Sequence, residues 1–155
     1  MSKLGSVRPP VEAILVVDDE PDILESLSDV FALHLPGVKI FTASNGTEGL
    51  KLLAKEKIGL VISDYKMPGM DGLEFLTKAC QVAPAAPRIL ITAYPELNVA
   101  VRAINEAQIQ NFLTKPITPQ ALLEAVNAAL LKGRSAAQKA ASAPAPPPGP
   151  AVRKY

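Results

Sequence analysis

Side chains that could do chemistry follow the short aliphatic runs of this sequence. They are two adjacent aspartates, a third aspartate, a threonine and a lysine: Asp18, Asp19, Asp64, Thr92 and Lys115. Three carboxylates that converge in one crevice repel each other and stay ionised together only when a cation compensates them. Oxygen ligands favour Mg²⁺ or Mn²⁺ over zinc. With an ammonium and a hydroxyl beside it, such a carboxylate can accept a phosphoryl group as an aspartyl phosphate.

Each of these residues also has an ordinary structural interpretation. Asp18 and Asp19 could begin a helix, because acidic side chains stabilise a helix N-terminus. Asp64 could be a turn residue, Thr92 a hydroxyl at the end of a strand, and Lys115 a surface lysine. All of them, however, occupy the same end of successive predicted strands. That shared placement favours a common site over independent structural roles.

Short runs rich in Ile, Val, Leu and Phe alternate with longer amphipathic segments. The runs predict buried strands at 12–17, 38–43, 58–63, 88–92 and 111–114, and the segments predict helices at 21–35, 46–56, 72–83, 96–108 and 119–131. In the fourth helix, Val99, Ala100, Ala103 and Ile104 form the expected buried stripe. The alternation predicts an α/β fold with a parallel sheet covered on both faces. Ligands of such sheets bind outside the carboxyl ends of the strands.

Composition narrows the class of protein. The chain has 155 residues, 48% apolar and 20% charged, which is typical of a single globular domain. The longest aliphatic run, Ile14–Val17, is far shorter than the ~20 residues of a membrane helix. The single cysteine, Cys80, and the single histidine, His34, exclude an internal disulfide and a zinc cluster. We therefore expect a cytoplasmic protein without a membrane anchor.

The two ends of the chain differ from the body. Residues 1–11 predict a disordered lead, and 12–131 form the folded domain. The body holds 11 basic and 15 acidic residues up to position 131, a net charge of −4, whereas 132–155 hold five basic residues and no acid. The segment 132–155 is rich in Ala and Pro and is interpreted as a disordered tail or linker. It could be a solvated extension, a docking segment for a partner, or an interdomain linker of a longer protein.

Four motifs resemble the receiver domain of bacterial two-component response regulators, of the single-domain type. They are Ile14-Leu15-Val16-Val17-Asp18-Asp19-Glu20, Ser63-Asp64-Tyr65-Lys66-Met67-Pro68-Gly69-Met70-Asp71-Gly72, Ile91-Thr92-Ala93 and Phe112-Leu113-Thr114-Lys115-Pro116. The resemblance covers about 12–131 and implies a flavodoxin-like (βα)5 doubly wound parallel sheet with strand order 2-1-3-4-5.

The resemblance also implies roles for individual residues. Asp64 would be the phosphoacceptor, supplied by a sensor histidine kinase or a phosphotransfer protein. Asp19 and Asp64 would bind Mg²⁺ (or Mn²⁺) directly with the Lys66 backbone carbonyl, and Asp18 would act through water. Lys115 would hold a phosphoryl oxygen and precede a cis peptide bond to Pro116.

The same resemblance implies roles for two further pairs of residues. Thr92 and Phe112 match the hydroxyl and aromatic switch positions, so that Thr92 moves toward the phosphoryl group and the ring of Phe112 fills the vacated space. A downstream partner, or a phosphorylation-dependent dimer, would then use the face made by the fourth helix, fifth strand and fifth helix. Lys66 and Tyr94 would flank the path of the hydrolytic water and set the lifetime of the phosphoryl group.

Two other functions remain open at this point. One is a Mg²⁺-dependent phosphohydrolase with an aspartate nucleophile, although Lys66 stands where such enzymes carry a second aspartate. The other is a scaffold that acts through its Pro-rich tail. We expect no turnover of an external substrate, and we expect no DNA-binding domain after residue 131.

Overall fold

The chain folds into one parallel sheet, seen in a computed structural model that describes residues 11–93 and 96–142. The 5-stranded sheet has the order β2-β1-β3-β4-β5, and all neighbouring strands are parallel. The strands are β1 (Ala13–Val17), β2 (Lys39–Ala43), β3 (Leu60–Asp64), β4 (Arg88–Thr92) and β5 (Asn111–Thr114). This arrangement confirms the predicted flavodoxin-like fold.

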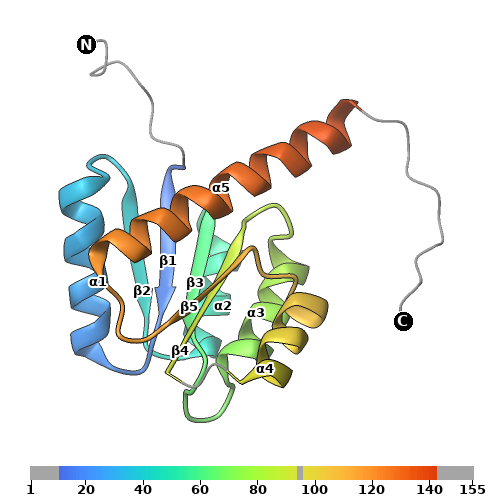
Figure 1. The fold of residues 1–155 in the computed structure, drawn as a ribbon. Coiled ribbons are helices and arrows are strands. Elements are labelled where there is room, and N and C mark those ends of the chain that lie inside the picture. Colours follow the sequence, from blue (N-terminus) through green and yellow to red (C-terminus); the bar gives the residue numbers. More distant parts are fainter. Residues whose placement is uncertain (1–10, 94–95, 143–155) are drawn as a thin grey trace.

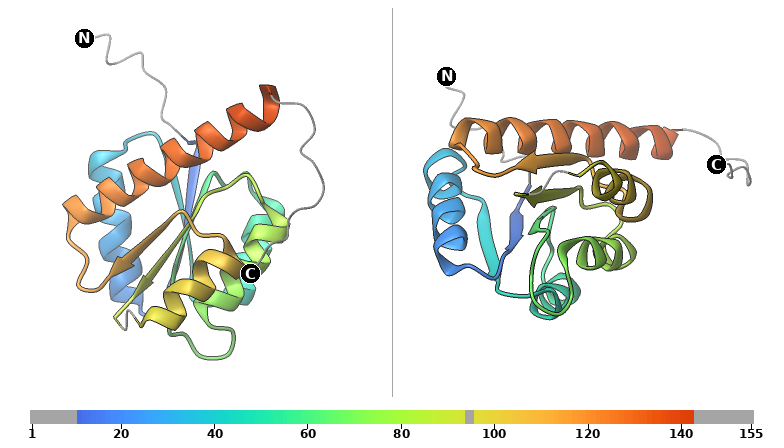
Figure 2. Two further views of the ribbon diagram at one scale, coloured as in Figure 1. Left: turned by 45° about the vertical axis from the view of Figure 1, so that its right-hand side comes forward. Right: turned by 60° about the horizontal axis from the view of Figure 1, so that its bottom comes forward.

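Helices cover both faces of the sheet (Figures 1 and 2). They are α1 (Pro21–His34), α2 (Gly46–Lys55), α3 (Gly72–Val82), α4 (Leu97–Arg102), the π-helix η1 (Ala103–Ala107) and α5 (Pro119–Ser142). Leu27 of α1 and Leu122 of α5 pack in one hydrophobic cluster, whereas Leu53 of α2 and Leu76 of α3 pack in the other. The side chains of β1 alternate between the clusters, because successive residues of a strand point to opposite faces.

The central strands carry the longest buried runs. Every residue of β1, β3 and β4 is buried, whereas the edge strands β2 and β5 are partly exposed. A strand covered on both faces is apolar along most of its length, which explains the short continuous aliphatic runs. It also makes polar residues at the strand ends stand out.

The last helix is longer than the sequence predicts. We expected it to end at residue 131, but α5 continues to Ser142 and extends past the sheet (Figure 1). Alanine has the highest helix propensity, and alanines are frequent in the stretch from 136 to 141, so intrinsic propensity favours continuing the helix through this segment. The interpretation as a disordered tail is therefore wrong for 132–142. The other parts of the predicted lead and tail, 1–10 and 143–155, lie outside the described residues.

The helix after β4 changes its winding halfway along. We expected one α-helix over 96–108, but α4 ends at Arg102 and passes into the π-helix η1. A π-helix is wound more widely than an α-helix and shifts the direction of the side chains that follow it. Ala103 and Ala107 are fully buried there, whereas Ile104 is 59% exposed, so the prediction of a buried Ile104 is wrong.

Within the described residues, no helix combines the length and the hydropathy needed to cross a bilayer.

Candidate functional site

Three carboxylates meet at the carboxyl edge of the sheet. Asp18 and Asp19 follow β1, and Asp64 is the last residue of β3. One carboxylate oxygen from each lies within 4.8 Å of the other two. Asp18 and Asp64 are buried, with 2% and 6% of their surface exposed, whereas Asp19 is exposed. The cluster therefore has a closed floor and an open side, and its oxygens are spaced to hold a divalent cation.

Backbone hydrogen bonds fix the two buried aspartates. The amide of Asp18 donates to the carbonyl of Ala43 at the end of β2 (3.1 Å), which ties the β1 end to its neighbour. The carboxylate of Asp18 accepts a hydrogen bond from the amide of Glu20 (2.9 Å), just before α1 begins. On β3, the amide of Tyr65 donates to Ile91 of β4 (2.8 Å), so the strand stays paired beyond Asp64.

Gly72 is needed where the chain returns to the end of β3. Its amide donates to the carbonyl of Tyr65 (2.7 Å), and its backbone lies against the Asp64 carbonyl. A Cβ at this position would collide with that carbonyl oxygen. The absence of a side chain therefore lets α3 start directly beside the phosphoacceptor candidate.

Lys115 brings a positive charge to the carboxylates from the end of β5. Its Nζ lies 3.0 Å from Oδ1 of Asp64 and 3.8 Å from Oδ2 of Asp18. Its amide donates to the carbonyl of Thr92 (2.9 Å), which continues the β4–β5 pairing up to the site. The peptide bond from Lys115 to Pro116 is cis, as predicted.

The charges of the site are not balanced. Burial raises the pKa of Asp18 to about 6, and the nearby Asp64 carboxylate adds to the rise, while the Glu20 amide and the Lys115 ammonium oppose it. Burial also raises the pKa of Asp64 against the opposing effect of Lys115. For Lys115 itself, burial favours the neutral amine, but the hydrogen bond and charge of Asp64 prevail and raise its pKa. Among the described ion pairs, Lys115 supplies the ammonium that faces these three carboxylates, and one positive charge does not balance three negative ones, so the site favours a bound cation.

Comparison with known proteins agrees with this geometry. Residues 14–127 match the response regulator receiver domain family. The chain belongs to that family. The match covers both aspartates after β1, Asp64, Thr92 and Lys115, so the resemblance read from the sequence motifs is confirmed.

Curated relatives and solved structures agree on the receiver domain. The chain is 39% identical over 117 residues to the transcriptional regulatory protein GlrR of Escherichia coli, covering 76% of this chain and 26% of GlrR. It is 39% identical over 118 residues to the response regulator protein PilR of Pseudomonas aeruginosa, covering 75% and 25%. The chain thus spans about a quarter of the length of these relatives.

Two similar solved structures are described as receiver domains. The signal receiver domain of an HD domain-containing protein from Pseudomonas fluorescens has a TM-score of 0.74 at 37% identity, with 83% of this chain and 99% of that chain covered. A CheY-like response regulator receiver domain protein from Methanospirillum hungatei has a TM-score of 0.75 at 31% identity, with 81% and 98% covered.

The other predicted site residues that the structure describes differ in burial. Thr92 is buried at the end of β4. Phe112 is half-buried and packs against the cluster that contains Val99, although its register partner on β4 is Leu90, not Thr92. Lys66 is exposed in the segment after β3. Tyr94 lies outside the described residues.

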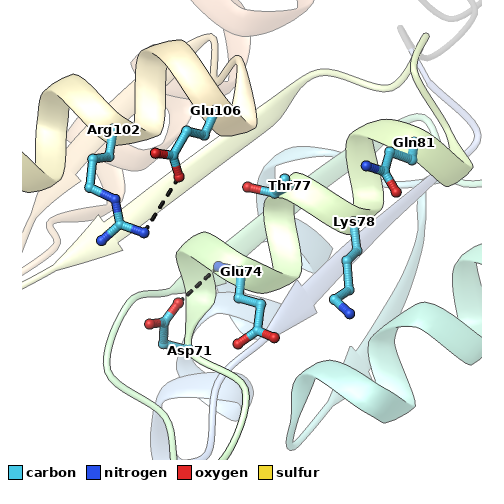
Figure 3. A pocket seen from close by; sticks show the side chains of 7 residues that line it. All are labelled: Asp71, Glu74, Thr77, Lys78, Gln81, Arg102 and Glu106. Carbon is cyan, nitrogen blue, oxygen red and sulfur yellow. Dashed lines mark hydrogen bonds and ion pairs between the residues drawn. The ribbon is translucent and has the colours of Figure 1, made fainter.

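A separate polar groove lies between α3 and the α4–η1 helix. It has a volume of about 420 Å³ and is lined by Asp71, Glu74, Thr77, Lys78, Gln81, Arg102 and Glu106 (Figure 3). Asp71 caps α3 by accepting from the Glu74 amide (2.8 Å), and Arg102 pairs with Glu106 (3.4 Å). None of the predicted site residues lines this groove, so it is distinct from the carboxylate site.

Sequence reasoning missed two residues that the structure makes important. Gly72 stood in a quoted motif without a role, and Arg88 was counted as part of an aliphatic strand. The available signal for Arg88 was a charged residue that opens a run expected to be fully buried. Arg88 is 3% exposed.

Proposed function

We propose that this receiver domain is a phosphorylation switch in which Asp64 accepts a phosphoryl group from a phosphohistidine. The donor is a sensor histidine kinase or a phosphotransfer protein. The observation that carries the proposal is the 3.0 Å contact between Lys115 Nζ and Asp64 Oδ1 beside two further carboxylates. Phosphoryl transfer needs mainly in-line positioning and neutralised charge, which Lys115 and a cation held by the carboxylates would supply.

The transfer uses the exposed side of the cluster. A carboxylate oxygen of Asp64 attacks the phosphorus of a phosphohistidine that is protonated on its other ring nitrogen. The bond from phosphorus to nitrogen breaks, its electron pair stays on that nitrogen, and the histidine leaves as neutral imidazole. Lys115 is placed to hold a phosphoryl oxygen where negative charge gathers, and its raised pKa keeps it protonated. Its loss should slow the transfer.

A divalent cation fits the donor set of the site. Asp19 and Asp64, with the Lys66 carbonyl, would hold Mg²⁺ or Mn²⁺ directly, and Asp18 would act through a water molecule. The cation would neutralise charge on the phosphoryl oxygens. The support for this is the unbalanced charge: in the described ion pairs, three carboxylates within 4.8 Å face the ammonium of Lys115, and burial disfavours the charged forms of two of them.

The readout would pass through β4 and β5. The hydroxyl of Thr92 would donate a hydrogen bond to a phosphoryl oxygen, and the ring of Phe112 on the neighbouring strand β5 would move further inward. The α4–β5–α5 face would then bind a downstream partner or a second copy of the domain. Exposed apolar residues support this face: Val101 and Ile104 are 44% and 59% exposed on α4 and η1, and Leu131 is 62% exposed on α5.

The proposed product is a covalently modified regulator, so no external substrate is turned over. Spontaneous hydrolysis of the aspartyl phosphate would reset the switch. We also propose that the protein acts in the cytoplasm.

Acetyl phosphate labelling tests the proposal. The wild-type protein should take up one phosphoryl group only when Mg²⁺ or Mn²⁺ is present, and Asp64→Asn should abolish the uptake. Asp22→Asn is the matched control, because Asp22 is an exposed aspartate in the first turn of α1. Normal labelling of Asp64→Asn would show that the nucleophile is assigned wrongly. Steady release of phosphate from an added phosphate ester would instead favour a phosphohydrolase.

A further inference from the structure

Arg88 is a buried cation that the phosphorylation site does not use. It opens β4, the strand that ends in Thr92, and is 3% exposed. Among the described residues it forms no salt bridge with an acidic side chain. This burial away from water lowers the pKa of the guanidinium. A buried charge is tolerated only when its hydrogen-bonding groups are satisfied.

Main-chain carbonyls from two separate segments satisfy this guanidinium. On one side, Nη1 donates to Ala86 (2.6 Å) and to Pro84 (3.4 Å), in the segment between α3 and β4. On the other side, Nε donates to Ala107 (2.9 Å) and Nη2 donates to Gln108 (3.1 Å). The planar guanidinium can serve acceptors on several sides at once, which a lysine ammonium on a flexible stem cannot reproduce.

The two carbonyls of the second side belong to the end of η1. The last carbonyls of a helix have no partner within the helix and carry its negative dipole end. Arg88 therefore caps the α4–η1 helix from a neighbouring strand. Gln110 adds to this junction: its side chain accepts from the Arg88 amide (2.7 Å), and its own amide donates to the Arg88 carbonyl (2.8 Å).

The capped end also sets the register of the π-helix. The amides of Gln108 and Ile109 both donate back to the carbonyl of Ala103, and Gln108 adopts a left-handed conformation with φ 51°. A π turn holds one residue more than an α turn, so its conversion into an α turn would shift the helix register on one side of it. Because Arg88 holds the carbonyls of Ala107 and Gln108, such a shift has to be taken up at the other end, in α4.

We propose that Arg88 is a positioning residue that anchors the C-terminal end of the α4–η1 helix, so that phosphorylation of Asp64 moves only the end next to Thr92. The inference rests on the proposed function. The two ends of this helix differ in how they are attached. The segment 93–96 leads from Thr92 into α4, whereas the carbonyls of Ala107 and Gln108 at the opposite end accept hydrogen bonds from Arg88 at the start of β4. Arg88 also donates to the carbonyl of Ala86 in the segment after α3.

Hydrogen exchange with and without acetyl phosphate and Mg²⁺ tests the anchor. In the wild type, phosphorylation should change amide exchange in 97–102 and leave 103–110 unchanged within about twofold. In Arg88→Lys, phosphoryl uptake should persist, exchange in 103–110 should be about tenfold faster before phosphorylation, and that segment should now respond to it. Arg102→Lys is the control on the same helix, because Arg102 is exposed and pairs only with Glu106 among the described contacts; it should behave as the wild type.

Either of two results would overturn the inference. One is an equal change of amide exchange in 97–102 and 103–110 when the wild type is phosphorylated. This result tests the inference even if Arg88→Lys does not fold. The other is unchanged exchange of 103–110 in a folded Arg88→Lys protein. A wild type that takes up no phosphoryl group would instead contradict the proposed function, and the unphosphorylated exchange of Arg88→Lys would still show whether the end of η1 is anchored.

Discussion

Removal of one buried negative charge should stabilise the metal-free protein. In Asp18→Asn the amide oxygen can still accept the hydrogen bond from the Glu20 amide, which is 2.9 Å from the carboxylate in the wild type. What disappears is a carboxylate whose pKa is raised from 3.8 to about 6, chiefly by burial. At about 1.4 kcal/mol per pKa unit, its ionisation costs the folded state about 3 kcal/mol.

The sign follows from linkage. A carboxyl group with a higher pKa in the folded state binds its proton more tightly there, so folding is favoured below the unfolded pKa of 3.8. This advantage is lost as the pH rises through the folded pKa of about 6. At a pH near the unfolded pKa of 3.8, Asp18→Asn and the wild type should therefore have equal free energies of unfolding. At about pH 7.5 the free energy of unfolding of the variant should be higher by about 3 kcal/mol.

Urea unfolding in the presence of a chelator measures this difference at both pH values. Asp29→Asn is the control, because Asp29 is exposed on α1, and its effect should stay within about 0.5 kcal/mol at either pH. Saturation with Mg²⁺ should narrow the gap, because the cation stabilises the wild type more than a variant that has lost one of the three carboxylates. The reasoning fails if metal-free Asp18→Asn is no more stable than the wild type at about pH 7.5.

Three further predictions concern the switch, the fold of the site and the lifetime of the phosphoryl group. Thr92→Ala should still be labelled by acetyl phosphate but should no longer bind its partner more tightly when phosphorylated, whereas Thr92→Ser should retain the response; a response in the Ala variant would refute the role. Gly72→Ala should lower the free energy of unfolding by about 2–4 kcal/mol in urea titrations, because the new Cβ meets a rigid carbonyl of β3. Gly46→Ala should cost less, since its nearest contact is the flexible end of a methionine, and equal losses would contradict this explanation. Phosphoryl decay in Lys66→Asn combined with Tyr94→Glu should be about tenfold faster than in the wild type, a barrier change of about 1.4 kcal/mol, and an unchanged decay rate would leave these two residues without a role.

Local patterns in the sequence are enough to locate most of the site. The aliphatic runs before Asp18, Asp64, Thr92 and Lys115 are long enough for strands and too short for helices. Strands separated by helices must be parallel, so their carboxyl ends meet at one edge. That rule needs no knowledge of distances, and the 3.0 Å contact of Lys115 with Asp64 is its consequence.

The same local reasoning failed where two patterns of equal strength compete. An alanine-rich segment without an apolar stripe can be a linker or a helix, and α5 continues through it to Ser142. Near Ile104, the expected α-helical stripe gave way to a π turn that buries Ala103 and Ala107 instead. A change of one residue in winding leaves no mark in apolar periodicity over so short a helix.

The sequence by itself determined which polar residues stand at the ends of the strands of a parallel sheet: the carboxylates, the hydroxyl and the lysine. It did so because strand period and helix period are local properties of the chain. Only the tertiary structure decided how deeply each charge lies and what compensates it. Asp18 is buried while its neighbour Asp19 is exposed, and Arg88 finds its acceptors in segments near Pro84 and Gln108. Desolvation and long-range hydrogen bonds depend on which segments meet in space, and no local pattern records that.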